Sequence, residues 1–237
     1  MNLLILYGQD FIAPNYISLN DYRYKHLVTI KKVSPGQCIK AGLLNANMGT
    51  AQVVLVDDKH IELTVDLSQP PPEPLNVHLI LALPRPKMLK RILQTVSAMG
   101  VKQLSLIHSA KVEKSYWQTP WLQKDKLNQH LILGLQQAGD TILPRVDVFQ
   151  RFKPFVEDIL PVLTVGRQAV LAHPGQGDLC LSQQTDKKST LLAIGPEGGF
   201  IQYEVDKLIQ AGFHTCHLGE RILRVENAIP VLLGRLL

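Results

Sequence analysis

The second half of the chain alternates between short apolar runs and apolar positions at helical spacing. Val77–Leu83 is a nearly continuous apolar run, typical of a strand buried on both faces. In Pro86–Met99 the apolar residues fall on one helical face, and Gly100 marks the end of the helix. The same rhythm predicts strands at Val101–Ile107, Ala169–Ala172, Leu191–Ile194 and His214–Leu218, and helices at Leu122–Ala138, Gln202–Ala211 and Val225–Leu236. Strands that alternate with helices predict an α/β domain with a mostly parallel sheet.

The N-terminal part of the chain has a different pattern, in which short β-rich segments are separated by turns. Asn2–Tyr7 predicts a first strand, and Thr50–Val56 with His60–Leu67 predicts a hairpin. Lys25–Val33 fits either a strand or a short helix. Several short strands in so short a segment favour a small β-barrel.

A proline-rich segment, Gln69–Pro74, separates the two patterns. Four of its residues are proline, which can join neither a helix interior nor the middle of a sheet. Such a segment favours an extended, semi-rigid connector. We therefore predict two domains, residues 1–70 and residues 71–237.

The composition, 46% hydrophobic and 19% charged residues, is that of a soluble globular protein. The apolar runs are too short to span a bilayer, and the N-terminus lacks the features of a signal peptide, so we expect a cytoplasmic protein without a membrane partner. Cys38, Cys180 and Cys216 are far apart and lack zinc-ligand spacing, so we expect free thiols and no metal. The net charge of +5 is compatible with a nucleic-acid partner but equally with many metabolic enzymes.

Two glycine-containing segments each follow an apolar run in the last third of the chain. They are Gly195-Pro196-Glu197-Gly198-Gly199 and Leu218–Arg224. In open α/β sheets, ligands bind at the carboxyl ends of the strands, where such turns lie. Gly195 permits a sharp turn, while Gly198 and Gly199 permit positive φ and a close approach of the backbone to a ligand. The spacing matches neither a dinucleotide fingerprint nor a P-loop. Tight strand-to-helix turns are an equally good interpretation.

Three further features allow both a functional and a structural interpretation. Arg224 suits an anion or a nucleobase edge, or pairs with a neighbouring glutamate on the surface. His173 lies in the turn Leu171–Gly175, which would add a third loop to the same sheet edge, although a lone histidine there is more often structural. A basic cluster provides phosphate contacts for RNA or simply forms a solvated helix face; it comprises Arg85, Lys87, Lys90 and Arg91.

Two linked motifs in the last third of the chain occur in the same order and spacing in one protein family. The first is Ile194–Phe200 with Glu204, and the second comprises Leu218-Gly219, Ile222-Leu223-Arg224, Glu226 and Ala228. The chain resembles the bacterial 16S rRNA uracil-N3 methyltransferases, members of the SPOUT class of RNA methyltransferases. The likeness extends forward, with less specific motifs, to Leu83-Pro84-Arg85, Lys90–Leu93, His26-Leu27, Lys32 and Pro35-Gly36.

The chain departs from the family pattern mainly outside these two motifs. Ser97–Gly100 stands where the family has Thr-Glu-Leu-Gly, and Ser109-Ala110-Lys111 where it has an arginine-serine pair. Gly134–Ala138 replaces an acidic-rich segment, and Asn227 replaces a threonine. The loops expected to hold the cofactor are therefore more typical of the family than the segments expected to face RNA.

The resemblance implies a fold, a cofactor and partners. The fold is a C-terminal SPOUT-type α/β domain with a trefoil knot, preceded by a small N-terminal PUA-like β-barrel. The partners are rRNA of the small ribosomal subunit and a second copy of the chain. The cofactor is S-adenosyl-L-methionine, held by three loops that contain Leu171, Ala172, His173, Ile194, Gly195, Pro196, Glu197, Gly198, Gly199, Leu218, Gly219, Ile222, Leu223 and Arg224.

The resemblance also implies a mechanism, methyl transfer to N3 of a uridine. Arg224 would stabilise negative charge on the ring carbonyls, and Glu197 or a water would accept the N3 proton. The target base must be unpaired or flipped out, and phosphate contacts would offset that cost. The residues expected to bind RNA are Lys32, Arg85, Lys87, Lys90 and Arg91.

Other functions remain open from the sequence. A SPOUT methyltransferase could act on another rRNA site or on tRNA. A non-catalytic RNA-binding relative would keep the fold without needing the cofactor, and a metabolic α/β enzyme would not bind rRNA at all.

Overall fold

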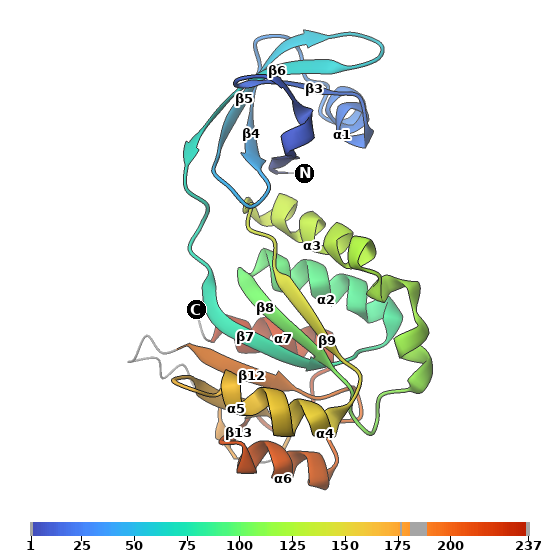
Figure 1. The fold of residues 1–237 in the computed structure, drawn as a ribbon, viewed down its shortest axis with the longest axis vertical. Helices are drawn as coiled ribbons and strands as arrows, with labels where there is room; N and C mark the ends of the chain where they lie inside the picture. The colour runs from blue at the N-terminus through green and yellow to red at the C-terminus, as the bar shows by residue number, and fades with distance from the viewer. Residues whose placement is uncertain (1, 176, 181–188, 236–237) are drawn as a thin grey trace. The chain divides into compact units, whose positions relative to one another are not determined.

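The computed structural model describes residues 2–175, 177–180 and 189–235. Its chain divides into two units (Figure 1). The first contains Met1–Glu73 together with Ile132–Leu143, and the second contains Pro74–Leu131 and Pro144–Leu237. The prolines of the predicted connector lie between the last strand of the first sheet and the first strand of the second.

The first unit is built on a curled six-stranded sheet in the order β1-β4-β5-β6-β3-β2. β1 pairs with β4 in parallel, and the other neighbours are antiparallel. The long hairpin of β5 and β6 begins and ends close to the predicted positions. The strands are β1 (Leu4–Leu6), β2 (Phe11–Ala13), β3 (Tyr16–Leu19), β4 (Cys38–Leu43), β5 (Met48–Val56) and β6 (Ile61–Gln69).

The segment that fitted either a strand or a helix is helical. Asp21 caps α1 (Tyr22–Lys25) by accepting a hydrogen bond from the Arg23 amide, and His26–Ile30 continues as a π-helical turn. Leu27 from this turn is buried in the sheet's core. A second cluster forms where Leu3 and Ile5 meet Leu135, and the amides of Asn2 and Leu3 both donate to the carbonyl of Gln136.

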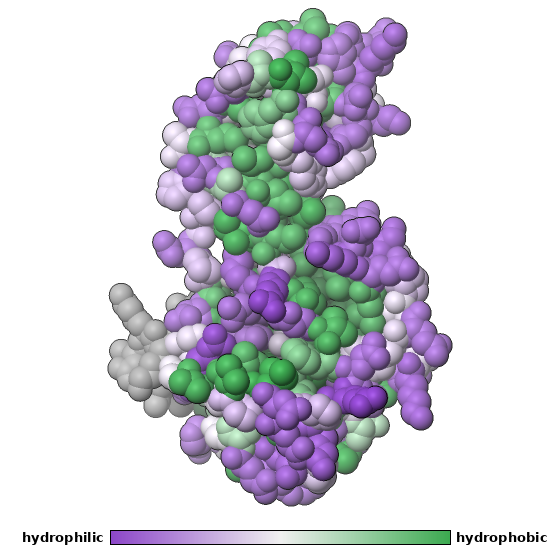
Figure 2. Space-filling view, viewed as in Figure 1, coloured by the Kyte–Doolittle hydropathy of each residue, from purple (hydrophilic) through white to green (hydrophobic). Residues whose placement is uncertain are grey.

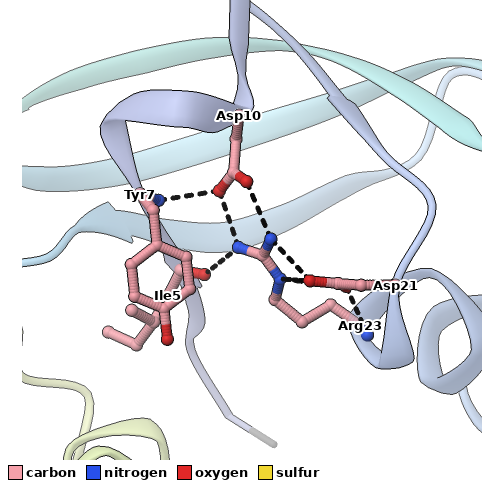
Figure 3. A network of polar contacts seen from close by, with 5 residues as sticks. All are labelled: Ile5, Tyr7, Asp10, Asp21 and Arg23. Atoms are coloured by element: carbon pink, nitrogen blue, oxygen red, sulfur yellow. Dashed lines mark hydrogen bonds and ion pairs between the residues drawn. The ribbon is translucent and has the colours of Figure 1, made fainter.

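A buried ion-pair network joins three segments of the first unit (Figure 3). The Arg23 guanidinium donates to both carboxylate oxygens of Asp10, at 2.6 and 2.8 Å, and to the carbonyl of Ile5 at 2.9 Å. Its Nε donates to Asp21, and Asp10 also accepts from the Tyr7 amide. Arg23 and Asp10 are only 2% and 5% exposed. Burial, offset in part by Arg23, raises the pKa of Tyr7 to about 12.

We expect Arg23→Ala to destabilise the first unit by about 3–5 kcal/mol, because it leaves the buried Asp10 carboxylate without its partner. Hydrogen exchange read by mass spectrometry, peptide by peptide over β1–β6, measures this locally. His60→Ala, which removes surface pairs with Asp57 and Glu62, should cost less than about 1 kcal/mol. Equal protection in the two variants would contradict the prediction.

The second unit contains a seven-stranded sheet in the order β11-β13-β10-β12-β7-β8-β9, with all neighbours parallel. The prediction of an α/β fold with a mostly parallel sheet is confirmed. β12 lies between β7 and β10, although it follows both in the chain. The strands are β7 (Leu75–Ala82), β8 (Val101–Ile107), β9 (Arg145–Phe149), β10 (Gln168–Ala172), β11 (Asp178–Leu179), β12 (Thr190–Ile194) and β13 (His214–His217).

Helices cover this sheet. α2 (Pro86–Ala98) begins with a proline in its first turn and buries Leu89, Ile92, Leu93 and Val96. The surface over α6 is hydrophilic in Figure 2, whereas Val205 and Leu208 on its inner face are buried. The other helical segments of this unit are α4 (Phe152–Pro154), a π-helical turn (Phe155–Ile159), α5 (Leu160–Leu163), α6 (Gln202–Gln210), α7 (Val225–Gly234) and short 3₁₀ turns at Lys114–Gln118 and Pro120–Leu122. α3 (Lys124–Ala138) begins in this unit and ends in the first, which also contains a 3₁₀ turn at Gly8–Asp10.

The sequence prediction was incomplete at several elements. It omitted β9, the short strands β2–β4 and β11, and the helical segment from Phe152 to Leu163. The end of the last predicted helix, Leu236, falls outside the described residues. Among the residues that the structure describes, no helix is long and apolar enough to cross a membrane, and no group of three or more His, Cys, Asp or Glu side chains could hold a metal.

Candidate ligand site at the carboxyl edge of the parallel sheet

Three neighbouring strands of the second unit end at one edge of the sheet. Ala172, the last residue of β10, is in register with Ile194 of β12 and with Cys216 of β13. The loops that follow these strands therefore lie side by side, although they are far apart in the sequence. They begin at His173, Gly195 and Leu218.

A pocket of about 690 Å³, partly open to solvent, lies among these loops. Its lining combines apolar side chains with backbone groups. The lining residues are Ala172, His173, Pro174, Ile194, Gly195, Pro196, Glu197, Gly199, Phe200, Cys216, His217, Leu218, Gly219, Arg221, Ile222, Leu223, Val225, Ala228 and Leu232.

Most of the residues expected to hold the cofactor line this one pocket. Three of them do not. Leu171 is fully buried within β10, and the carbonyl of Gly198 accepts a hydrogen bond from Lys111 Nζ at 2.6 Å. Arg224 is exposed at the start of α7, where its carbonyl accepts from the amides of Asn227 and Ala228.

Several lining residues were missed in the sequence. Cys216 and His217 are the last residues of β13, a short strand whose sequence indicated no particular side chain as a lining group. Val225, Ala228 and Leu232 follow at helical spacing along α7, so they lie on one face of that helix. That spacing was visible in the sequence, but it predicts a buried face without saying what the face covers.

The glycines of the second loop meet two different demands. Gly199 has φ +70°, as expected, so the backbone there favours glycine. Gly198 does not adopt the positive φ that glycine permits, and a Cβ at that residue would lie 2.9 Å from Cδ of Lys111. At Gly195 the turn is so tight that a Cβ would lie 3.0 Å from the Phe200 amide nitrogen, so the turn favours glycine there.

A buried carboxylate holds the second loop in place. Glu204, at the start of α6, is only 2% exposed. Its Oε1 accepts a hydrogen bond from the Ala110 amide at 2.7 Å, and its Oε2 accepts from Ser109 Oγ at 3.0 Å and from the Ile201 amide at 3.1 Å. Because Ser109 and Ala110 follow β8, one side chain joins the loop after β8 to the loop after β12.

Glu197 and Arg85 connect the pocket to the loop after β7. Glu197 Oε1 accepts from the Arg85 amide at 3.2 Å and lies 4.0 Å from Arg85 Nε. The Arg85 side chain is 66% exposed, so this ion pair is a surface one and contributes little to stability. Its side chain therefore lies at the surface beside Glu197, a residue of the pocket lining.

The basic cluster does not form a single free face. Lys87 and Arg91 are exposed on α2, whereas Lys90 Nζ lies 3.9 Å from the centroid of the Trp121 ring, a cation–π contact. Lys32 is in the first unit, at φ +51°.

An open parallel sheet with one pocket among its strand-end loops defines the class of α/β proteins that bind a small ligand at the carboxyl edge. The chain belongs to the RNA methyltransferase family, since a family model for the RNA methyltransferase domain matches residues 71–237.

Curated relatives and solved structures resemble the whole chain. The ribosomal RNA small subunit methyltransferase E of Treponema pallidum is 29% identical over 230 residues, which cover 95% of this chain and 86% of the relative. One from Borreliella burgdorferi is 24% identical and covers 96% and 94%. The crystal structure of ribosomal RNA small subunit methyltransferase E from Neisseria gonorrhoeae, bound to S-adenosylmethionine, shares the fold with a TM-score of 0.78 at 19% identity, covering 98% and 95%. A Legionella pneumophila methyltransferase, in complex with the same cofactor, gives 0.79 at 19% identity, covering 99% and 96%.

We expect Glu204→Gln to destabilise the second unit by about 1–3 kcal/mol. The new side-chain NH2 group is a donor, so at least one of the groups that donate to the Glu204 carboxylate loses its acceptor. Both tryptophans, Trp117 and Trp121, lie in this unit, so their fluorescence during urea unfolding measures the change. Asp206→Asn, on the exposed face of the same helix, is the matched control. A Glu204→Gln midpoint equal to that of the control would contradict the structural role of Glu204.

Proposed function

We propose that the protein is an S-adenosylmethionine-dependent methyltransferase that acts on N3 of a uridine in small-subunit ribosomal RNA. The observation that carries this proposal is the pocket formed by the loops after β10, β12 and β13. The names of the curated relatives support the rRNA substrate. The cofactor found in two structures of the same fold supports the methyl donor.

The residues present fit that donor. The apolar side of the pocket suits an adenine ring, and Ile222, 79% exposed, and Leu223 are free to pack on its face. Backbone groups of the loops at Gly195–Gly199 and Leu218-Gly219 suit its polar edge. Gly199 and Gly219 have positive φ and no Cβ, so a ligand can approach their backbone closely. S-Adenosylmethionine supplies an activated methyl group when bound.

The chain's own residues must place and activate the uridine. In neutral uracil N3 carries a proton, which must be removed before N3 can act as a nucleophile. Glu197, on the pocket wall, accepts this proton directly or through a water. Arg224 stabilises the negative charge that develops on the ring carbonyls. Arg85, which lies beside Glu197, orients the carboxylate and contacts the RNA.

The finer features of the fold also belong to this proposal. The late insertion of β12 between β10 and β7, with α7 packed on α2, supports a trefoil knot in the second unit. The curled sheet of the first unit supports a PUA-like barrel that binds RNA through Lys32. The apolar Val231 is exposed on α7, which supports a homodimer. Methylation of ribosomal RNA would place the protein in the cytoplasm.

The proposal predicts that cells without this gene lack N3-methyluridine in small-subunit rRNA, as measured by nucleoside mass spectrometry. Wild-type protein and Arg145→Ala, a change at a surface pair on β9, should restore the modification. Arg224→Ala should not restore it, although calorimetry should find its affinity for S-adenosylmethionine nearly unchanged.

The alternatives give different results in the same experiments. Unaltered N3-methyluridine together with loss of another methylated nucleoside would indicate a different RNA site. A purified protein that binds rRNA but does not bind S-adenosylmethionine would indicate a non-catalytic relative. Restoration by Arg224→Ala would remove that residue's catalytic role.

The exposed cations of α2 predict the salt dependence of RNA binding. The slope of log K against log salt should become less steep by about one in Lys87→Ala and in Arg91→Ala, because each change removes one phosphate contact. Lys90→Ala should change the slope less, since its ammonium packs on Trp121. Lys153→Ala, at a surface pair with Glu157, is the control. Equal slopes for all four variants would make the cluster a solvated face.

A further inference from the structure

Two thiols meet at the wall of the pocket. Cys216 Sγ donates a hydrogen bond to Cys180 Sγ at 2.8 Å. The backbone fixes this approach: β11 pairs with β13, and the amide of Cys180, just after β11, donates to the carbonyl of His217 at 2.8 Å. The pairing of β11 with β13 therefore keeps the two cysteines close to each other.

The two thiols have different chemical character. The hydrogen bond from Cys216 lowers the pKa of Cys180 to about 7, and the nearby Arg235 guanidinium, which donates to the Cys180 carbonyl, acts in the same direction. Hydrogen bonding to Cys180 and burial raise the pKa of Cys216, which is 7% exposed. Cys180 is thus the more nucleophilic thiol at neutral pH, and Cys216 is placed to resolve a mixed disulfide.

We propose that Cys180 and Cys216 form a reversible disulfide that weakens ligand binding in the adjacent pocket. The oxidant is a small disulfide such as glutathione disulfide. The Cys180 thiolate attacks one of its sulfurs, forms a mixed disulfide and expels one glutathione thiolate. Cys216 then loses its proton to solvent, attacks Cys180 Sγ and expels the second. The two cysteines are oxidised, and glutathione disulfide is reduced to two thiols.

The coupling to the pocket follows from the position of Cys216. It lines the pocket, and its carbonyl accepts a hydrogen bond from the His173 amide at 2.9 Å, in the loop after β10. A disulfide bond is about 2.05 Å long, so the sulfurs must move closer than their present 2.8 Å. Closing this gap reorients the Cys216 side chain and so changes the pocket wall that it shares with His173 and His217.

The disulfide is tested independently of the proposed function. Cys38 is exposed, so Cys38→Ser removes the thiol most prone to join two molecules. This protein is equilibrated over a series of glutathione ratios, alkylated, digested and analysed by mass spectrometry. We expect a peptide pair linked through Cys180 and Cys216, reversed by dithiothreitol. In Cys216→Ser, Cys180 should instead keep a glutathione adduct. A lasting adduct on Cys180 without the linked pair, with Cys216 still present, would overturn the proposal.

The effect on binding rests on the proposed function and is measured with S-adenosylmethionine by calorimetry. We expect the oxidised protein to bind it about tenfold more weakly, and bound ligand to disfavour the disulfide by the same factor. Equal affinity of the oxidised and reduced forms would overturn the coupling. A reduced protein that binds no S-adenosylmethionine would instead contradict the proposed function, and the linked peptide would still be observed.

Discussion

The Glu204 carboxylate is the constraint on which the geometry of the candidate site depends. A buried carboxylate is costly unless donors surround it, and here three donors from two segments do so. Separating the loop after β8 from the start of α6 would leave the buried carboxylate without most of its donors, so the two segments stay together. The Lys111 side chain adds a second tie, since its ammonium donates to the Gly198 carbonyl between those segments.

Three consecutive residues of the loop after β8 meet this constraint. Ser109, Ala110 and Lys111 each contact the second loop or α6. Ser109 supplies a hydroxyl donor to the carboxylate, and Ala110 supplies its amide, which any residue can do. One hydroxyl, one backbone amide and one ammonium group therefore hold this loop against the second loop and α6.

The sequence predicted those parts of the fold that leave a local pattern. Val77–Leu83 and Leu191–Ile194 are apolar because they lie in the sheet interior, and α2 and α6 are amphipathic because one face is buried. β9 (Arg145–Phe149) was missed because all residues of this edge strand are at least partly exposed, so it has no continuous apolar run. The segment from Phe152 to Leu163 was missed because Pro154 and Pro161 argue against a helix, although both are tolerated in its short turns.

The candidate site was predictable as a set of loops but not as a pocket. Glycine after an apolar run marks a turn at a strand end, which is a local property. That β10, β12 and β13 are neighbours is a non-local one, because β12 enters between strands that precede it in the chain. Cys216 and Leu232 line the pocket because of that strand order, and nothing in the sequence around them predicts it. The glycines Gly195, Gly199 and Gly219 reach one pocket only because the strands before them lie side by side in the sheet.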